Sequence, residues 1–304
     1  MNGLVTVDVV GRGWAAEQQA LAEMGKRHGE DYVFTTCVPS LGEWVHSVTP
    51  GAIPLGKLAV VGGRTGNNKT RLLWNLAADF IQQAVTVGFV SLEIDAAEAT
   101  PAIWSILTNV PAKHLSPGHY FKPAEAEQVD ETIERNIQEG AWGKLLTNKR
   151  SASLTTLDDS LGWMATMNSS AGVKIFLIDY FQLLSAESDV RHFGVLKDAV
   201  HRIVSFIEET GALVVVASQF NRQSSAPNAR PTIESLDSCP LLSKQAHFGW
   251  LLDHTRRQDE EHITRTWLLV EKNRHGRGGD IPIEIDYRTH RIRQALQDEE
   301  ELWP

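Results

Sequence analysis

The sequence predicts an α/β fold in which a mostly parallel sheet is flanked by helices, and three observations support this prediction. Beyond residue 58, short apolar runs typical of strands alternate with segments of helical periodicity. Runs such as residues 175–178 (I-F-L-I) and 213–216 (L-V-V-V) are nearly continuous, which is typical of strands covered by helices on both faces. A glycine-containing loop joins the first of these strands to the first helical segment.

The expected elements follow one another without an internal repeat. Pro123 lies near a helix start, and Gly140 and Gly211 lie just past helix ends, in agreement with the usual start and stop signals. Helices are expected over residues 70–84, 96–108, 123–139, 154–168 and 190–210. Strands are expected over residues 58–62, 86–92, 173–179, 212–218, 266–271 and 281–286.

The chain is expected to divide into a leader, one large domain and a tail. Residues 1–54 contain a short amphipathic helical pattern over residues 15–27 and a connecting arm with several prolines and glycines. Residues 55–295 form the α/β domain, and residues 296–304 form an acidic tail. A length of 304 residues, of which 42% are hydrophobic, suits one such domain.

Composition narrows the compartment and the partners. The net charge of −9 argues against a generally cationic surface, although a locally basic channel for nucleic acid is compatible with it. Two cysteines provide no disulfide framework, which favours a reducing compartment. No apolar stretch is long enough to span a membrane, and the first residues lack the pattern of a signal peptide. We therefore expect a cytoplasmic protein without a membrane partner.

Residues 63–70 read G-R-T-G-N-N-K-T, close to the phosphate-binding pattern G-x-x-x-x-G-K-[ST]. In such a P-loop, loop amides and the helix N-terminus face the phosphates, Lys69 would reach the outer phosphates, and the Thr70 hydroxyl would bind Mg²⁺. Asn68 replaces the second glycine, but asparagine tolerates left-handed backbone angles, so the loop is still expected to close around phosphate. The alternative is a structural turn without a ligand. The expected nucleotide-binding residues are Gly63, Arg64, Thr65, Gly66, Asn67, Asn68, Lys69, Thr70 and Arg71.

Three other predicted strands end in polar residues. Asp179 is expected to hold Mg²⁺ together with Thr70, unless it only caps the next turn. Glu93 ends the strand after the P-loop helix, where a carboxylate would orient an attacking water; the alternative is a surface acid at a helix start. Gln219 ends a buried strand, where its amide would sense the γ-phosphate, and an ordinary polar strand end explains the pattern equally well.

A basic turn follows the strand expected over residues 266–271. Residues 272–277 read K-N-R-H-G-R, and the next strand begins near residue 281. On such a hairpin, Lys272 and Arg274 would reach a neighbouring subunit's nucleotide and stabilise the transferring phosphoryl group, as an arginine finger does. A solvated hairpin tip is the alternative.

Taken in this order, the motifs resemble the ATPase domain of the DnaB-type replicative helicases, a RecA-like hexameric family. The resemblance covers about residues 55–293 and implies a RecA-like P-loop NTPase core with a C-terminal β-hairpin. It is carried by residues 63–70, by S-L-E at 91–93, by I-D-Y-F-Q-L at 178–183, by S-Q-F-N-R at 218–222 and by K-N-R-H-G at 272–276.

The resemblance implies an ATP-dependent motor, a hexameric ring or filament that acts on single-stranded DNA as a 5′–3′ helicase core. It would hydrolyse ATP with Mg²⁺ at subunit interfaces, and accessory proteins are compatible with it. The implied catalytic residues are Lys69, Glu93, Gln219, Lys272 and Arg274. Candidate nucleic-acid contacts, each also explained as ordinary surface charge, are Arg191, Arg222, Arg230 and Lys244.

Three features depart from the family pattern. Asn68 replaces the P-loop glycine. Only 57 residues precede Leu58, so the family's N-terminal helical domain is expected to be missing. Residues 235–247 follow the family's channel-loop helix loosely, with Ser243 and His247 where acidic residues are expected. Asn68, the missing N-terminal domain and the acidic net charge keep a second function open: a nucleotide-binding assembly or scaffold protein with weak or no ATPase activity, acting as a switch in a larger complex.

Overall fold

The computed structural model describes residues 32–33, 53–92, 94, 96–148, 156–184, 192–220, 230–236 and 240–295. In this part of the chain, no helix is both long enough and apolar enough to cross a membrane. The helices are α2 (Lys69–Gln82), α3 (Ala96–Thr108), α4 (Ala112–Leu115), α5 (Pro123–Gln138), α6 (Leu157–Ala171), α7 (His192–Thr210) and α8 (Pro240–Gln245), with 3₁₀ turns η2 (Phe181–Leu184) and η3 (Ile233–Ser235). The strands are β1 (Tyr32–Val33), β2 (Ile53–Pro54), β3 (Leu58–Gly63), β4 (Val87–Ser91), β5 (Leu145–Thr147), β6 (Ile175–Asp179), β7 (Leu213–Gln219), β8 (Phe248–Leu252), β9 (Gln258–Asp259), β10 (Ile263–Asn273), β11 (Gly279–Asp286) and β12 (Ile292–Gln294).

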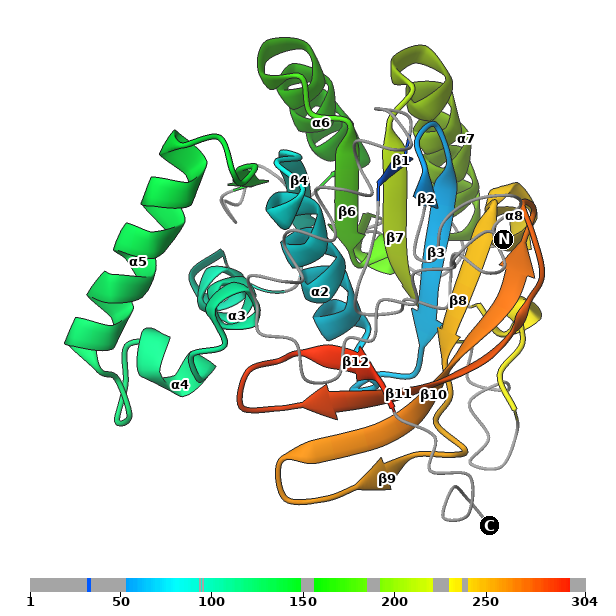
Figure 1. Cartoon of the computed structure of the whole chain (residues 1–304). Coiled ribbons are helices and arrows are strands. Elements are labelled where there is room, and N and C mark those ends of the chain that lie inside the picture. The colour runs from blue at the N-terminus through cyan, green and yellow to red at the C-terminus, as the bar shows by residue number, and fades with distance from the viewer. Residues whose placement is uncertain are drawn as a thin grey trace, which may run out of the picture.

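Ten of these strands form one sheet in the order β12-β11-β10-β8-β3-β7-β6-β4-β5, with β9 paired to β10. The strands from β8 to β5 are parallel, whereas β10, β11 and β12 extend the sheet in antiparallel fashion. In Figure 1 the long hairpin of β10 and β11 lies beside β8 at one side of the parallel strands. We call the edge at which the parallel strands end the carboxyl edge, and the edge at which they begin the amino edge.

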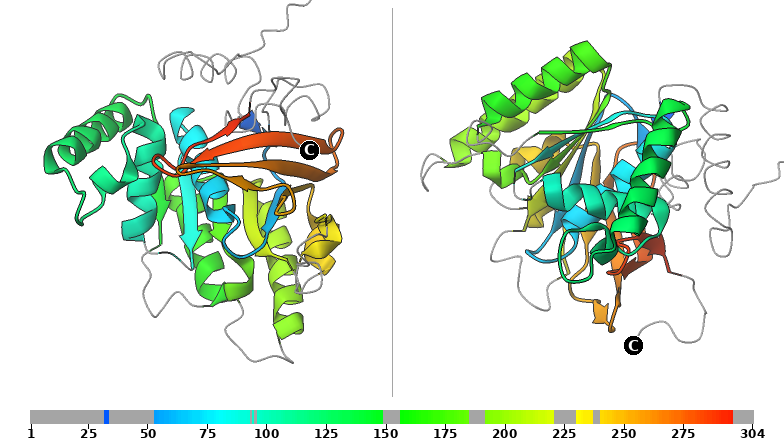
Figure 2. Two further views of the ribbon diagram at one scale, coloured as in Figure 1. Left: turned by 90° about the horizontal axis from the view of Figure 1, so that it is seen from below. Right: turned by 90° about the vertical axis from the view of Figure 1, so that its left-hand side faces the viewer.

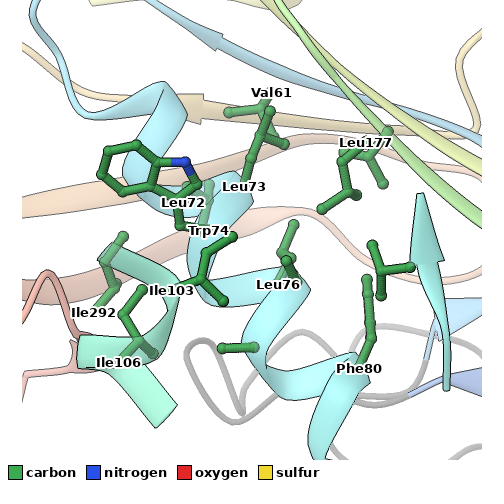
Figure 3. Close-up of a cluster of buried hydrophobic side chains, with 14 of the residues drawn as sticks. Val61, Leu72, Leu73, Trp74, Leu76, Phe80, Ile103, Ile106, Leu177 and Ile292 are labelled. Carbon is green, nitrogen blue, oxygen red and sulfur yellow. The ribbon is translucent and has the colours of Figure 1, made fainter. Parts of the chain in front are cut away.

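The sheet separates two hydrophobic cores. On one face, α2 packs on the sheet and α3 packs on α2, through buried residues such as Leu73 and Ile103. On the other face, α6, α7 and α8 cover the sheet through residues such as Phe176 and Ile203. Figure 2 shows helices on both sides of the sheet, and Figure 3 shows Leu73 of α2 beside Val61 of β3. Burial on both faces explains why the strand sequences are continuously apolar.

The predicted six strands and five helices are all present, with ends shifted by up to three residues. The predicted leader helix over residues 15–27 and the acidic tail lie outside the described residues, and the domain boundaries stay predictions. The pattern missed β8, whose five buried residues read F-G-W-L-L, because a short apolar run has no distinguishing period. Also missed were the short elements β5, β9, β12, α4 and α8.

Two glycines provide a test of how tightly the helices pack on the sheet. A Cβ atom on Gly88 of β4 would lie 2.5 Å from the ring of Phe176. That side chain is fully buried, and its ring makes T-shaped contacts with Trp163 and Phe206, so a shift of the ring would disturb both contacts. Gly88→Ala is therefore expected to lower the free energy of unfolding by about 1–3 kcal/mol.

The matched control is Gly162→Ala. Gly162 lies within α6, and no atom lies within 4 Å of the added Cβ, so alanine is expected to raise the free energy of unfolding by about 0.5–1 kcal/mol. Chemical denaturation of both variants measures the two shifts. Equal shifts in the same direction would contradict this packing.

Candidate functional site

The loop between β3 and α2 lies at the carboxyl edge. A backbone hydrogen bond of 3.1 Å from the Asn67 amide to the Arg64 carbonyl closes the loop. The first backbone bond of α2 runs from the Leu72 amide to the Asn68 carbonyl, at 3.0 Å. The amides of the first turn therefore precede the helical bonding pattern and face the loop, which is the arrangement that binds anions at a helix N-terminus.

Side chains fix the loop from both sides. The Lys69 ammonium donates to the carbonyl oxygens of Gly63 (3.1 Å) and Arg64 (2.9 Å), so it lies over the loop. The Asn67 side chain donates to the carbonyl of Leu252 at the end of β8, at 2.9 Å. The loop is thus bonded both to its own lysine and to the neighbouring strand.

Asn68 has the left-handed backbone that its position in the P-loop pattern predicts, with φ 61° and ψ 18°. Its side chain is buried and engaged at both polar atoms. Nδ2 donates to the Tyr287 hydroxyl at 3.1 Å, and Oδ1 accepts from the Arg71 guanidinium at 2.7 Å. The asparagine thus keeps the glycine-like turn and ties it to the end of β11 and to α2.

Tyr287, directly after β11, is the centre of a cluster beside the loop. Its hydroxyl lies 3.0 Å from the Thr264 hydroxyl and accepts from Arg257 at 3.3 Å. The Arg71 guanidinium lies 4.5 Å from its ring centroid, and Arg257 also donates to the Gly66 carbonyl at 3.4 Å. An aromatic ring and a guanidinium plane are groups on which a nucleobase can stack.

The predicted strand-end residues Asp179 and Gln219 also lie at the carboxyl edge. Asp179 ends β6 and is 1% exposed, and Gln219 ends β7 in register with Gly63. Gln182, from η2, joins the two strand ends: its amide nitrogen donates to the Ser218 hydroxyl at 3.0 Å, and its amide oxygen accepts from the Gln219 backbone at 3.3 Å. The structure therefore brings the P-loop, Asp179 and Gln219 to one edge.

Thr70 and Asp179 are the residues predicted to hold Mg²⁺ beside a nucleotide. Thr70 lies in the first turn of α2, and Asp179 lies two strands away, with β7 between them. Among the described residues, no group of three or more His, Cys, Asp and Glu side chains could hold a metal ion. One carboxylate and one hydroxyl suit Mg²⁺, which keeps several waters and binds through substrate phosphates.

Lys272 and Arg274 lie at the amino edge, away from this loop. Asn273, between them, pairs with Phe248 of β8, which pairs with Ala59 near the start of β3. The P-loop begins four residues beyond Ala59, which is ~13 Å along the strand, and β8 separates β10 from β3. Within one chain, the predicted finger residues and the P-loop thus occupy opposite edges of the sheet.

At the amino edge, both finger side chains contact the end of α8. The Lys272 ammonium donates to the carbonyl oxygens of Ser243 (2.6 Å) and Lys244 (2.9 Å), and Arg274 donates to that of Lys244 (2.5 Å). Carbonyls at a helix C-terminus favour cations. Burial, and then the charge of Arg274, lower the pKa of Lys272 below its ordinary value.

The other predicted residues divide into two groups. Glu93, Arg191 and Arg222 lie outside the described residues, and their roles stay predictions. Arg230 is described and donates to Glu271 at 2.9 Å and to Asp280 at 3.0 Å, so two carboxylates offset its charge. Lys244, the fourth nucleic-acid candidate, lies beside the finger residues at the end of α8.

Sequence reasoning missed Tyr287, Arg257 and Gln182. Tyr287 is 219 residues from Asn68, and Arg257 is 191 residues from Gly66, so no local pattern links them to the P-loop. Gln182 lies within the motif at residues 178–183, but its bonds to β7 depend on the order of the strands in the sheet.

A family model and individual relatives of this chain both point to DnaB-like helicases. The model of the DnaB-like helicase C-terminal domain family matches residues 44–294. The replicative DNA helicase DnaB of Mycoplasma genitalium is 23% identical over 247 residues, which cover 76% of this chain and 50% of that protein. The probable plasmid replicative DNA helicase of Chlamydia psittaci is 25% identical over 257 residues, 82% of this chain and 53% of that protein. The chain thus spans about half the length of these relatives.

Solved structures share the fold. One of them, described as an ATPase domain, has a TM-score of 0.68 at 16% identity, covering 94% of this chain and 99% of that one. A DnaB-like replicative helicase, studied for its interactions with primase, has a TM-score of 0.67 at 14% identity, covering 94% of this chain and 68% of that one. These likenesses confirm the predicted RecA-like core.

Asn68 provides a test of the loop geometry. Asn68→Ala removes two side-chain hydrogen bonds. It also places alanine, which adopts left-handed backbone angles less readily than asparagine, at φ 61°. The free energy of unfolding is therefore expected to fall by about 2–3 kcal/mol. Asn68→Gly removes the same bonds, but glycine adopts the left-handed angles without strain, so about half of that fall in the free energy of unfolding is expected. Chemical denaturation distinguishes them, and equal losses would contradict a strained left-handed turn.

His290 provides a test of the cluster behind the P-loop helix. Its Nδ1 accepts from Arg71 at 3.0 Å, and its ring lies edge-on to Trp74. Burial, and then the charge of Arg71, lower the pKa of His290 to about 4, whereas a histidine in an unfolded chain has a pKa of about 6.5. The unfolded chain therefore binds the proton first, and the stability that neutral His290 contributes is complete above pH ~6.5 and is lost as pH falls toward 4.

An NMR titration of the His290 ring checks this directly. The ring is expected to stay neutral down to a pH of about 4. Titration near the ordinary histidine value would contradict the buried position of the ring beside Arg71.

Proposed function

The chain belongs to the DnaB-like helicase C-terminal domain family, and from that membership we propose that it is the ATPase core of an oligomeric motor that acts on single-stranded DNA. The observation that carries this proposal is the separation of two sets of residues. The residues predicted to bind phosphate lie at the carboxyl edge of the sheet, and Lys272 and Arg274, the predicted finger pair, lie at the amino edge.

ATP with Mg²⁺ is the ligand that the carboxyl edge fits. The first-turn amides of α2 and the Lys69 ammonium would bind the phosphates, and Thr70 and Asp179 would hold the metal. Bound Mg²⁺ would neutralise charge on the phosphates during transfer. The side-chain amide of Gln219 would sense the outer phosphate, and the bond from its backbone to Gln182 would link it to the segment that follows Asp179.

A second copy of the chain is part of this proposal, and the position of the predicted finger pair supports it. Lys272 and Arg274 are too far from their own P-loop to stabilise charge there, but a neighbour packed against the carboxyl edge would bring its own pair to the nucleotide. This supports hydrolysis at subunit interfaces in a ring or filament, and a hexamer is the closed form that we propose. Both side chains would have to exchange the α8 carbonyls for phosphate oxygens.

Single-stranded DNA is the substrate that we propose for the motor, in the cytoplasm and with accessory proteins as further partners. Arg191, Arg222 and Lys244 stay candidates for backbone phosphates. Arg230 would contribute less, because Glu271 and Asp280 already bind it.

Mixing two inactive variants tests hydrolysis across the interface. Lys69→Ala loses phosphate binding but keeps the finger, and Arg274→Ala keeps the P-loop but loses the finger. Each alone is expected to lose Mg²⁺-dependent ATPase activity, by roughly a thousand-fold for Arg274→Ala, the scale of a trans-acting arginine. An equal mixture is expected to recover activity, because intact P-loops then meet intact fingers.

Arg277→Ala is the matched control, since it removes an exposed arginine from the same hairpin turn. It should retain activity, and single-stranded DNA should stimulate the wild type. Loss of activity in Arg274→Ala with no recovery on mixing would contradict the trans arrangement. A wild type no more active than Lys69→Ala would leave a nucleotide-binding switch or scaffold without hydrolysis.

A further inference from the structure

A buried asparagine follows β5 and completes the end of β4. Asn148 is 3% exposed, and it lies just beyond the last residue of β5. Its Oδ1 accepts from the Ser91 amide at 2.7 Å, and its Nδ2 donates to the Ser91 carbonyl at 3.0 Å. One side chain thus satisfies both backbone groups of a residue 57 positions away in the sequence.

This amide replaces a strand where the strand has ended. The pairing of β4 with β5 stops at Phe89 and Thr147, two residues before Ser91. Beyond that point the backbone of Ser91 is buried and needs a donor and an acceptor. Among side chains of this size only an asparagine amide offers both in the geometry of a peptide group.

The segment held in this way adjoins the proposed metal site. Ser91 is in register with Asp179 on the other side of β4, and the Leu92 amide donates to the Asp179 carbonyl at 2.8 Å. The Ser91 hydroxyl also donates to the carbonyl of Ile94. The backbone groups of Ser91, Leu92 and Ile94 are therefore all hydrogen-bonded, and Asn148 makes two of these bonds.

We propose that Asn148 is a positioning residue for ATP hydrolysis. It holds the end of β4 level with Asp179, and Glu93, the residue predicted to orient the attacking water, follows Leu92 directly in the sequence. This rests on the proposed function and on the predicted role of Glu93 in orienting the water. Nucleotide binding depends on the P-loop between β3 and α2 instead, so the loss of Asn148 should affect hydrolysis and leave binding intact.

The catalytic and structural effects of Asn148 can be separated with a matched asparagine. Asn168 donates its side-chain amide to the Val173 carbonyl at 2.8 Å, just before β6 at the amino edge. Asn168→Ala removes a comparable side-chain-to-backbone bond at the opposite edge from the nucleotide. Any effect of general destabilisation should appear in that variant as well.

The experiment compares the wild type, Asn148→Ala, Asn148→Asp, Asn168→Ala and Lys69→Ala. ATP turnover, binding of a fluorescent ATP analogue and amide exchange of the 87–92 segment are measured for each. Asn148→Ala is expected to lower kcat by about ten- to a hundred-fold, the cost of misplacing a catalytic group, while the Kd of the analogue changes less than about two-fold. Asn148→Asp keeps the volume and the acceptor but loses the donor, so it should also lose turnover.

Faster amide exchange at Ser91 in Asn148→Ala, but not in Asn168→Ala, should accompany the loss of turnover. A normal kcat in Asn148→Ala beside an active wild type would overturn this inference alone. An equal loss of kcat in Asn168→Ala would overturn it too, because the effect would then be general. A wild type that turns over no faster than Lys69→Ala would overturn the proposed function, and this inference with it.

Discussion

The hydrogen-bonded register of the parallel strands is the constraint on which the rest of the structure depends. It places Ser91 beside Asp179 and Gly63 beside Gln219, so that the strand ends meet at one edge. Side-chain amides then continue this order beyond the strands: Gln182 binds the end of β7, and Asn148 binds the end of β4. Because the strands are buried on both faces, a slip of one residue would place apolar side chains against the wrong core, and the register is strongly fixed.

The antiparallel hairpin of β10 and β11 reaches both the carboxyl edge and the amino edge of the sheet. β10 and β11 run the full depth of the sheet, from the P-loop side to the amino edge. Tyr287 at one end binds Asn68 of the P-loop, and Arg274, the proposed finger, lies at the other end. The ribbon therefore contacts the P-loop of its own subunit at one end and carries the proposed finger at the other, so that in the proposed ring or filament it would link adjacent sites.

The sequence allowed prediction of features that depend on local pattern. Lys69 and Thr70 follow from the strand-loop-helix context, Asp179 from its place at the end of an apolar run, and the left-handed turn at Asn68 from the tolerance of asparagine for such angles. The placement of the P-loop and of Lys272 and Arg274 at opposite edges also follows once the strands are paired. The strand β8, which separates β10 from β3, was missed because its short apolar run lacks a period. Tyr287, Arg257 and Asn148 were not predictable, because each acts on backbone or side chains 57 to 219 residues away. The roles of Glu93, Arg191 and Arg222 remain predictions.

Binding of Mg²⁺-ATP to the purified chain tests the central claim most directly, since every proposed role depends on a triphosphate in a P-loop that carries asparagine for glycine. Equilibrium titration with a fluorescent ATP analogue should show saturable binding that unlabelled ATP displaces. Binding should weaken without Mg²⁺ and be lost in Lys69→Ala, whose ammonium lies over the loop in the wild type. A wild type that binds the analogue no more tightly than Lys69→Ala would contradict the account.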